Sequence, residues 1–249
     1  MRIGVTCFEC CNDTNLSDAE VTYAALRDDA LYTFRCSRGH EHHIVLLQMR
    51  FEVLAEVAVQ AILDGYYRDA VSSFTASLER FYEFFVQAAI ITKHVPKDTF
   101  DATWKLVRKQ SERQLGMYLA LYLLEVGTLP PTLTNDQTKF RNSVVHDGHI
   151  PSEEEAILFG QSVIEIVHTV LIEMNRRYRD AVQILKSHHT AEASRPGVGF
   201  MSHAMVYELA PSEDQPPKIL KDELQRRRQS PILDRFKWAT KPPVQNDEG

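Results

Sequence analysis

One short segment of the sequence, Arg141–His146, combines side chains that can cleave RNA without a metal ion. On a helix Asn142 and His146 are four residues apart and share a face, and Arg141 lies about 100° of helix rotation from Asn142. An imidazole titrates near neutral pH, so a histidine can accept or donate the proton of a ribose 2′-hydroxyl. An arginine presents fixed donors to the phosphate oxygens, where negative charge accumulates. The pattern therefore permits RNA cleavage in which Arg141, Asn142 and His146 form the catalytic set.

Cleavage of this kind uses two proton-transferring groups, a base beside the attacking hydroxyl and an acid beside the leaving oxygen. One copy of the segment supplies only one of them, His146. A twofold homodimer supplies the second, because an isologous contact brings the same residue of both copies to one axis. Asn142 can orient the imidazole or hold a ribose hydroxyl. We therefore predict a homodimer with a composite site and RNA as its substrate.

A second group of residues, near the start of the chain, has the types and spacing of a structural metal site. One half is a Cys-x2-Cys pair and the other is a Cys-x3-His pair, in which Gly39 permits a tight turn. Three thiolates and one imidazole make a closed tetrahedral shell, the kind that holds structural Zn²⁺. We predict that this zinc is bound by Cys7, Cys10, Cys36 and His40.

Three neighbouring residues are rival ligands for the metal: Cys11, His42 and His43. The gap between the two pairs is long, and Cys-x3-His stands where Cys-x2-Cys is more usual. The cysteines could instead form disulfides, but the start of the chain lacks the apolar segment of a secretory signal. In a reducing cytosol a Cys-x2-Cys pair indicates metal binding, so we expect a cytoplasmic protein with reduced cysteines.

The segment Arg141–His146 resembles the Arg-x4–6-His motif of HEPN domains, with the polar residue that this family favours directly after the arginine. Residues 66–71 and 78–81 also resemble the second-helix pattern of some members, and the resemblance covers residues 44–188. It implies an antiparallel helical bundle that pairs so that two motifs form one cleft. It also implies a metal-independent endoribonuclease, as in toxin–antitoxin and antiphage defence systems, with an antitoxin or other regulatory protein partner. The N-terminal residues 1–43 resemble a zinc ribbon.

The elements that must position these residues are mostly helices. Apolar residues recur every three or four positions, as the buried face of a helix requires. The pattern predicts helices over residues 44–63, 67–93, 98–125, 135–146 and 152–186. Asn135 or Asp136 is expected to cap the short helix that carries the catalytic set, and Ser152 with Glu155 forms a capping box at the last helix.

The predicted fold class is therefore mainly α, in three parts. A zinc-ribbon-like β module at 1–43 precedes a HEPN-like bundle at 44–188 and a partly irregular C-terminal extension at 189–249. The formal net charge of -6 argues against a protein that coats nucleic acid over its whole surface, but it permits a small basic cleft. The sequence has no uninterrupted apolar run long enough to predict a membrane span.

Two functions remain open at this point. The complete Arg–Asn–His set favours an enzyme. The alternative is a non-catalytic HEPN module that binds RNA, a nucleotide or a protein partner, because fold does not determine function and this superfamily includes inactive members. The sequence lacks a Gly-rich phosphate loop and a Gly-x-Ser-x-Gly motif, so nothing supports nucleotide hydrolysis or serine-esterase chemistry.

Overall fold

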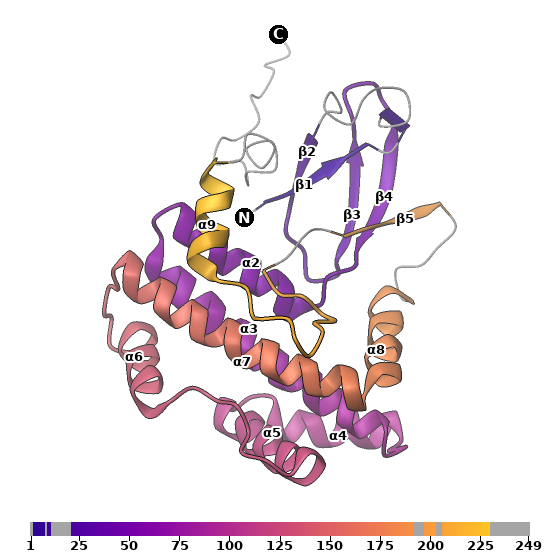
Figure 1. Ribbon diagram of the computed structural model, residues 1–249. Helices are drawn as coiled ribbons and strands as arrows, with labels where there is room; N and C mark the ends of the chain where they lie inside the picture. The colour runs from indigo at the N-terminus through magenta and orange to yellow at the C-terminus, as the bar shows by residue number, and fades with distance from the viewer. Residues whose placement is uncertain (1, 8, 11–20, 192–196, 203–205, 230–249) are drawn as a thin grey trace. The chain divides into compact units, whose positions relative to one another are not determined.

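A computed structural model of the protein describes residues 2–7, 9–10, 21–191, 197–202 and 206–229 (Figure 1). The chain forms two compact units. The first, here the β unit, comprises Met1–Leu47, Glu192–Ser202 and Arg226–Gly249, and the second, here the helical unit, comprises Gln48–Ala191 and His203–Gln225. The described chain is mainly helical with a small N-terminal β region, which confirms the predicted fold class at this level.

The β unit contains two small sheets. In one, β1 pairs antiparallel with β2; in the other, β4 pairs antiparallel with β3 and parallel with β5. The bounds are β1 Arg2–Thr6, β2 Val21–Ala25, β3 Leu31–Arg35, β4 Glu41–Leu46 and β5 Val198–Met201. Tyr32 and Phe34 on β3 are buried and alternate with outward-facing residues, as the period of two in a strand requires.

Residues 44–46 belong to β4, whereas the apolar pattern predicts that they begin a helix. Three consecutive buried residues are compatible with a strand covered on both faces or with a helix, so local periodicity does not separate the two. Residues 44–46 form a strand because they pair with β5, which comes from the predicted C-terminal extension. This strand pairs with the end of β4, and just beyond it the N–H of Leu47 donates to the carbonyl oxygen of Met201 at 2.9 Å.

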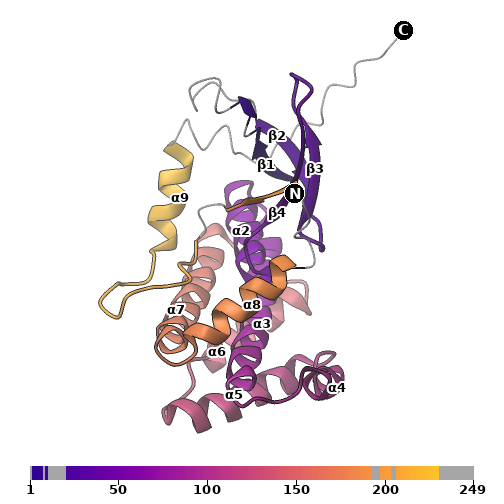
Figure 2. The same cartoon turned by 90° about the vertical axis from the view of Figure 1, so that its right-hand side faces the viewer.

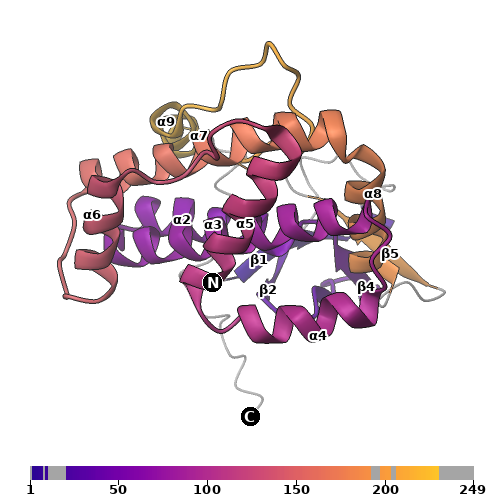
Figure 3. The same ribbon diagram turned by 90° about the horizontal axis from the view of Figure 1, so that it is seen from below.

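The helical unit is built around α3, which contacts α2, α5, α6, α7 and α8. The bounds of its helices are α2 Arg50–Leu63, α3 Tyr67–Ile91, α4 Lys97–Val107, α5 Ser111–Val126, α6 Asn135–Val145, α7 Glu153–Arg177 and α8 Arg179–Ala191. The last helix, α9 Leu220–Gln229, begins in this unit, and its residues from Arg226 on are assigned to the β unit. The long helices α3 and α7 lie side by side (Figures 1 and 2). The short helix α6 lies where α7 begins, and α8 lies where α7 ends (Figure 3). Apolar side chains from all of these helices form one core.

Side-chain caps set the start of the two helices nearest the predicted catalytic set. The predicted capping box at α7 is present, because the hydroxyl of Ser152 accepts from the backbone N–H of Glu155 and the carboxylate of Glu155 accepts from that of Ser152. At α6 the cap is Thr134, not Asn135 or Asp136 as predicted. Its hydroxyl accepts from the N–H of Gln137, whose side chain accepts in return, so the box begins one residue earlier.

The predicted helix over residues 98–125 is two helices, α4 and α5, separated at residues 108–110. The backbone of Gln110 is extended, at φ −133° and ψ 116°, and this interrupts the helix. Side chains of α5 then satisfy carbonyls left open at the end of α4: Gln114 donates to the carbonyl of Arg108 at 2.7 Å, and Arg113 to that of Leu106. The signal for this break is the absence of an apolar residue between Val107 and Leu115.

The predicted helix over residues 152–186 is also divided. It breaks at Tyr178, whose backbone lies at φ −128° and ψ 24°. The Tyr178 side chain is buried against the ring of Phe85, and its hydroxyl donates to the carboxylate of Glu125 at 3.1 Å. These contacts with α3 and α5 are long-range, so the apolar period that runs through α7 and α8 does not reveal the break.

Gly160 leaves room for a close contact between α7, α3 and Leu220. A Cβ atom at this position of α7 would lie 2.5 Å from a ring carbon of Phe74 on α3 and 2.7 Å from a methyl carbon of Leu220. We expect Gly160→Ala to lower the free energy of unfolding by about 1–3 kcal/mol, because overpacking outweighs the gain in helix propensity. Urea denaturation measures this. Gly116→Ala on α5 is the matched control, because a Cβ atom at this position meets nothing within 4 Å. The free energy of unfolding of this variant should equal that of the wild type or exceed it. Equal destabilisation by both substitutions would contradict the packing argument.

Candidate functional site

The four predicted metal ligands lie together in the β unit. The Sγ atoms of Cys7, Cys10 and Cys36 and a ring nitrogen of His40 all lie within 4.8 Å of one another. Nδ1 of His40 is 3.5, 3.4 and 3.5 Å from the three sulfurs in that order, and the sulfurs of Cys10 and Cys36 are 3.8 Å apart. Ligands placed tetrahedrally around zinc would be about 3.8 Å apart for two sulfurs and about 3.5 Å for sulfur and nitrogen. The donor set therefore has the geometry to bind a metal.

Two tight turns bring these donors together. In the first, the backbone N–H of Cys10 donates to the sulfur of Cys7 at 3.4 Å. In the second, between β3 and β4, Gly39 at φ +87° closes a turn in which its N–H donates to the carbonyl of Cys36 and the N–H of Cys36 donates to the carbonyl of His40. Burial raises the pKa of Cys36, but N–H groups of His40 and Arg38 stabilise its thiolate and bring the pKa down to about 7. A thiolate is the form that binds a metal.

The structure distinguishes between two of the rival ligands. His43 points away from the cluster, with Nδ1 hydrogen-bonded to the hydroxyl of Thr33 at 2.9 Å. Nε2 of His42 lies 2.9 Å from the sulfur of Cys7, and its ring stacks on Phe34 with centroids 4.9 Å apart. His42 is thus placed to donate a hydrogen bond to a ligand thiolate. Cys11, the third rival, lies outside the described residues.

Glu9, inside the first turn, is a residue that the sequence analysis did not single out. Its carboxylate lies 3.4 Å from Nε2 of His40, while Nδ1 of the same ring faces the sulfurs. A metal-binding histidine usually donates its second N–H to a carboxylate, which sets the tautomer and the ring orientation. The arrangement of Glu9 and His40 therefore matches a ring that binds a metal through Nδ1.

The three predicted catalytic residues lie at the end of α6 in the helical unit, but with different exposure. Arg141 is partly buried, whereas Asn142 and His146 are exposed. His146 ends the helix, and its N–H donates to the carbonyl of Asn142 at 2.8 Å. Arg141 therefore faces the bundle, and the side chains of Asn142 and His146 are open to solvent within the described chain.

The positive charge of Arg141 lies near an acidic and an aromatic residue of α3, Glu79 and Tyr82. Burial raises the pKa of Glu79, and the positive charges of Arg141 and Arg80 partly oppose that rise. Burial also raises the pKa of Tyr82, again opposed by Arg141. Nε of Arg141 is buried and has no hydrogen-bond partner among the described residues. Arg141 is therefore partly buried beside α3, close enough to Glu79 and Tyr82 for its charge to act on both.

Two further residues near the end of α6 were not anticipated from the sequence. Arg68, at the start of α3, donates to the carbonyl of Val145 at 3.5 Å and so contacts the last turn of α6. His149 is exposed, lies with Nε2 3.7 Å from the carboxylate of Glu155, and has its ring edge-on to Phe140. Arg68 lies in the stretch 66–71 that carries part of the HEPN resemblance. For His149 the spacing gives no signal, because only the turn after α6 brings it beside Phe140.

Among the described residues one helix, α7, is long and apolar enough to cross a membrane, and half of its most apolar window is buried in the protein. A helix in the core of a globular protein passes the same test, so this is weak evidence of a membrane span.

Comparison of the chain with models of known families, with curated proteins and with solved structures found no significant match.

Proposed function

We propose that the helical unit is a metal-independent endoribonuclease of the HEPN type, with Arg141, Asn142 and His146 as its catalytic set. The observation that carries the proposal is the difference in solvent exposure between Arg141 and His146 at the end of α6. Arg141 is partly buried near Glu79 and Tyr82 on α3, whereas His146 is exposed at the helix end. A transition-state donor acts best when it is held in place, and a proton-transfer group must reach the substrate. The two residues differ in the way these two roles require.

In the proposed reaction the ribose 2′-hydroxyl attacks the adjacent phosphorus, and the bond to the 5′-oxygen of the next nucleotide breaks. One His146 removes the proton of the hydroxyl, and the His146 of a second copy protonates the leaving oxygen. The guanidinium of Arg141 stabilises the charge on the non-bridging oxygens. Asn142, which is exposed beside His146, orients the ring or holds a ribose hydroxyl. The products are a 2′,3′-cyclic phosphate and a free 5′-hydroxyl.

The direct test is incubation of the purified full-length protein with total RNA in the presence of EDTA. Cleavage that persists in EDTA and leaves 2′,3′-cyclic phosphate ends is the expected result. DNA of the same sequence should remain intact, because it lacks the attacking hydroxyl. RNA binding without cleavage would instead favour the alternative function, a non-catalytic module of the same fold that binds RNA, a nucleotide or a protein partner.

The composite site requires a homodimer, and this is a prediction in its own right. At micromolar concentration the protein should sediment at about 57 kDa, twice its 28.5 kDa. Ile150 lies four residues after His146 and is 80% exposed, so it is a natural part of the proposed interface. Ile150→Asp should favour the monomer, because it places a charge in that interface. Leu124→Asp on α5, at 78% exposure, is the matched control and should leave the dimer intact. A wild-type protein that sediments only as a monomer contradicts the composite site.

We further propose that the metal of the β unit is a structural Zn²⁺ bound by Cys7, Cys10, Cys36 and His40. Three thiolates and one imidazole complete a tetrahedral shell and leave no open position for substrate. The ion would fix the two turns that carry its ligands, and the β unit would then act as a small zinc-ribbon-like module. A cytoplasmic toxin or antiphage effector, controlled by an antitoxin or another protein partner, is the setting in which we place this activity.

A further inference from the structure

An exposed arginine lies beside the proposed catalytic set without a carboxylate partner in the described chain. Arg68, in the first turn of α3, donates to the carbonyl oxygen of Val145 at 3.5 Å. That carbonyl belongs to the peptide bond between Val145 and His146, so the guanidinium lies next to the end of α6. Arg68 forms no ion pair with a described residue, although Asp69 and Asp147 are near in sequence to the two residues in contact. Its positive charge is therefore not neutralised within the described residues.

The contact with α6 leaves most of the Arg68 guanidinium available. An arginine has several N–H donors, and this one forms a single long bond to the negative end of the α6 helix dipole. The bond places the side chain at α6 without removing its charge, and the side chain is exposed. A guanidinium placed in this way can form a bidentate contact with the oxygens of a phosphate.

The turn before α3 adds an exposed aromatic ring. Tyr66 is 63% exposed, and among the described residues of the helical unit it is the only aromatic side chain that is exposed. It is the N-cap of α3, a position that favours a short side chain accepting a backbone N–H, and it forms no such bond. By contrast, α6 and α7 begin with the side-chain caps Thr134 and Ser152. Helix formation therefore does not explain the tyrosine at the start of α3.

We propose that the start of α3 is an RNA subsite beside the catalytic set, and that it takes an unpaired strand. Arg68 binds the phosphate next to the one that is cleaved, and the ring of Tyr66 stacks on a neighbouring base. The two residues are two positions apart, so their Cα atoms are at most about 7 Å from each other. Stacking requires an exposed base face, which a single strand offers and a duplex hides. The subsite rests on the proposed function, because RNA is the ligand that the catalytic set implies.

The test is the binding of a short fluorescent 2′-O-methyl RNA to the full-length protein, measured by fluorescence anisotropy. The methyl group blocks the attacking hydroxyl, so the affinity is measured whether or not the protein cleaves RNA. Arg68→Gln should weaken the binding of the single strand about 10- to 100-fold, the effect of losing one charge-assisted contact. It should also reduce the slope of log K against log salt concentration by about 0.7, the contribution of one phosphate of a single strand.

The stacking contact is tested with the same probe. Tyr66→Ala should weaken the binding of the single strand about 5- to 150-fold, as the loss of one stacked base does. Tyr66→Phe keeps the ring and should restore the affinity. The same strand annealed to its complement should bind more weakly than the single strand. The proposal is wrong if Tyr66→Ala binds like the wild type, or if the duplex binds as tightly as the single strand.

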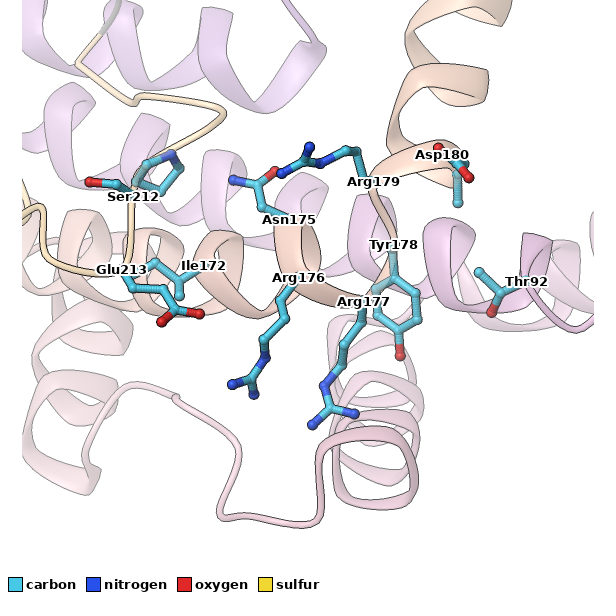
Figure 4. Close-up of a pocket in the computed structure, with 12 residues that line it drawn as sticks. Thr92, Ile172, Asn175, Arg176, Arg177, Tyr178, Arg179, Asp180, Ser212 and Glu213 are labelled. Atoms are coloured by element: carbon cyan, nitrogen blue, oxygen red, sulfur yellow. The ribbon is translucent and has the colours of Figure 1, made fainter.

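Arg179→Gln is the matched control for Arg68→Gln, because it removes the same charge from another exposed arginine that has no ion pair with a described residue. Arg179 lines a hollow at the other end of α7, a helix of 25 residues that spans about 37 Å. Figure 4 shows that it extends on the opposite side of the helix from Arg176 and Arg177. Those two already donate to the carboxylate of Glu173, at 2.6 and 3.0 Å.

The control variant should bind the single strand with the affinity and the salt dependence of the wild type. Equal effects of Arg68→Gln and Arg179→Gln would overturn the subsite, even in a protein that cleaves unmodified RNA. The expected effects of Arg68→Gln and Tyr66→Ala in a protein that does not cleave RNA would support the subsite and reject the ribonuclease. The two proposals can therefore fail separately.

Discussion

Replacing His146 by alanine is expected to lower the rate of RNA cleavage by about 100- to 10,000-fold, the usual contribution of a general acid or base. The reason is that the proposed site uses one His146 from each copy, so the substitution removes the acid and the base together. The side chain is exposed and ends α6, so its loss should leave the melting temperature nearly unchanged. Initial rates on one labelled RNA measure the effect.

His188→Ala is the matched control, because His188 is also an exposed histidine near the end of a helix, on α8. It should cleave RNA at the wild-type rate. Arg141→Ala should also lower the rate, but a stability measurement must accompany it because Arg141 is partly buried near Glu79. Asn142→Ala should have a smaller effect if Asn142 only orients the ring. Equal rates for wild type and His146→Ala would refute the assignment and favour the binding module.

Loss of the metal is expected to unfold the β unit and to leave the helical unit folded. Structural zinc contributes roughly 10–16 kcal/mol in small domains that depend on it, and the sheets of the β unit are short. The helical unit has its own apolar core and needs no metal. Elemental analysis of the purified protein should find one zinc per chain. After chelation, far-ultraviolet circular dichroism should retain most of the helical signal, while amides of β3 and β4 lose protection from hydrogen exchange.

Two histidines of the β unit provide a matched pair for this prediction. His40→Ala should abolish stoichiometric zinc, because Nδ1 of His40 completes the donor set. His43→Ala should retain it, since His43 bonds to Thr33 and not to the sulfurs. His42→Ala should lower the affinity by about 10- to 100-fold, as the loss of an outer hydrogen bond to a ligand usually does. A metal-free protein whose β unit remains folded would contradict the site.

Much of this molecule follows from local sequence, where the residues that determine a feature are close together in the chain. The capping box of Ser152 and Glu155 is contained within four residues, and the structure confirms it. The pair Cys7 and Cys10 and the pair Cys36 and His40 each lie within a single turn, so their spacing predicts the donor set that the structure brings together. The helical character of the central region follows from its apolar period for the same reason.

The tertiary structure decided the features that depend on residues far apart in the chain. At the break at Tyr178 that side chain is buried against Phe85 on α3 and bonds to Glu125 on α5, both far away in the sequence. Glu79 lies near Arg141 only because α6 packs on α3. An apolar period records which face of a helix is buried, but it does not record which distant residue covers that face. That is the physical reason why the sequence by itself determined the candidate ligands and catalytic residues, and the packing determined their surroundings.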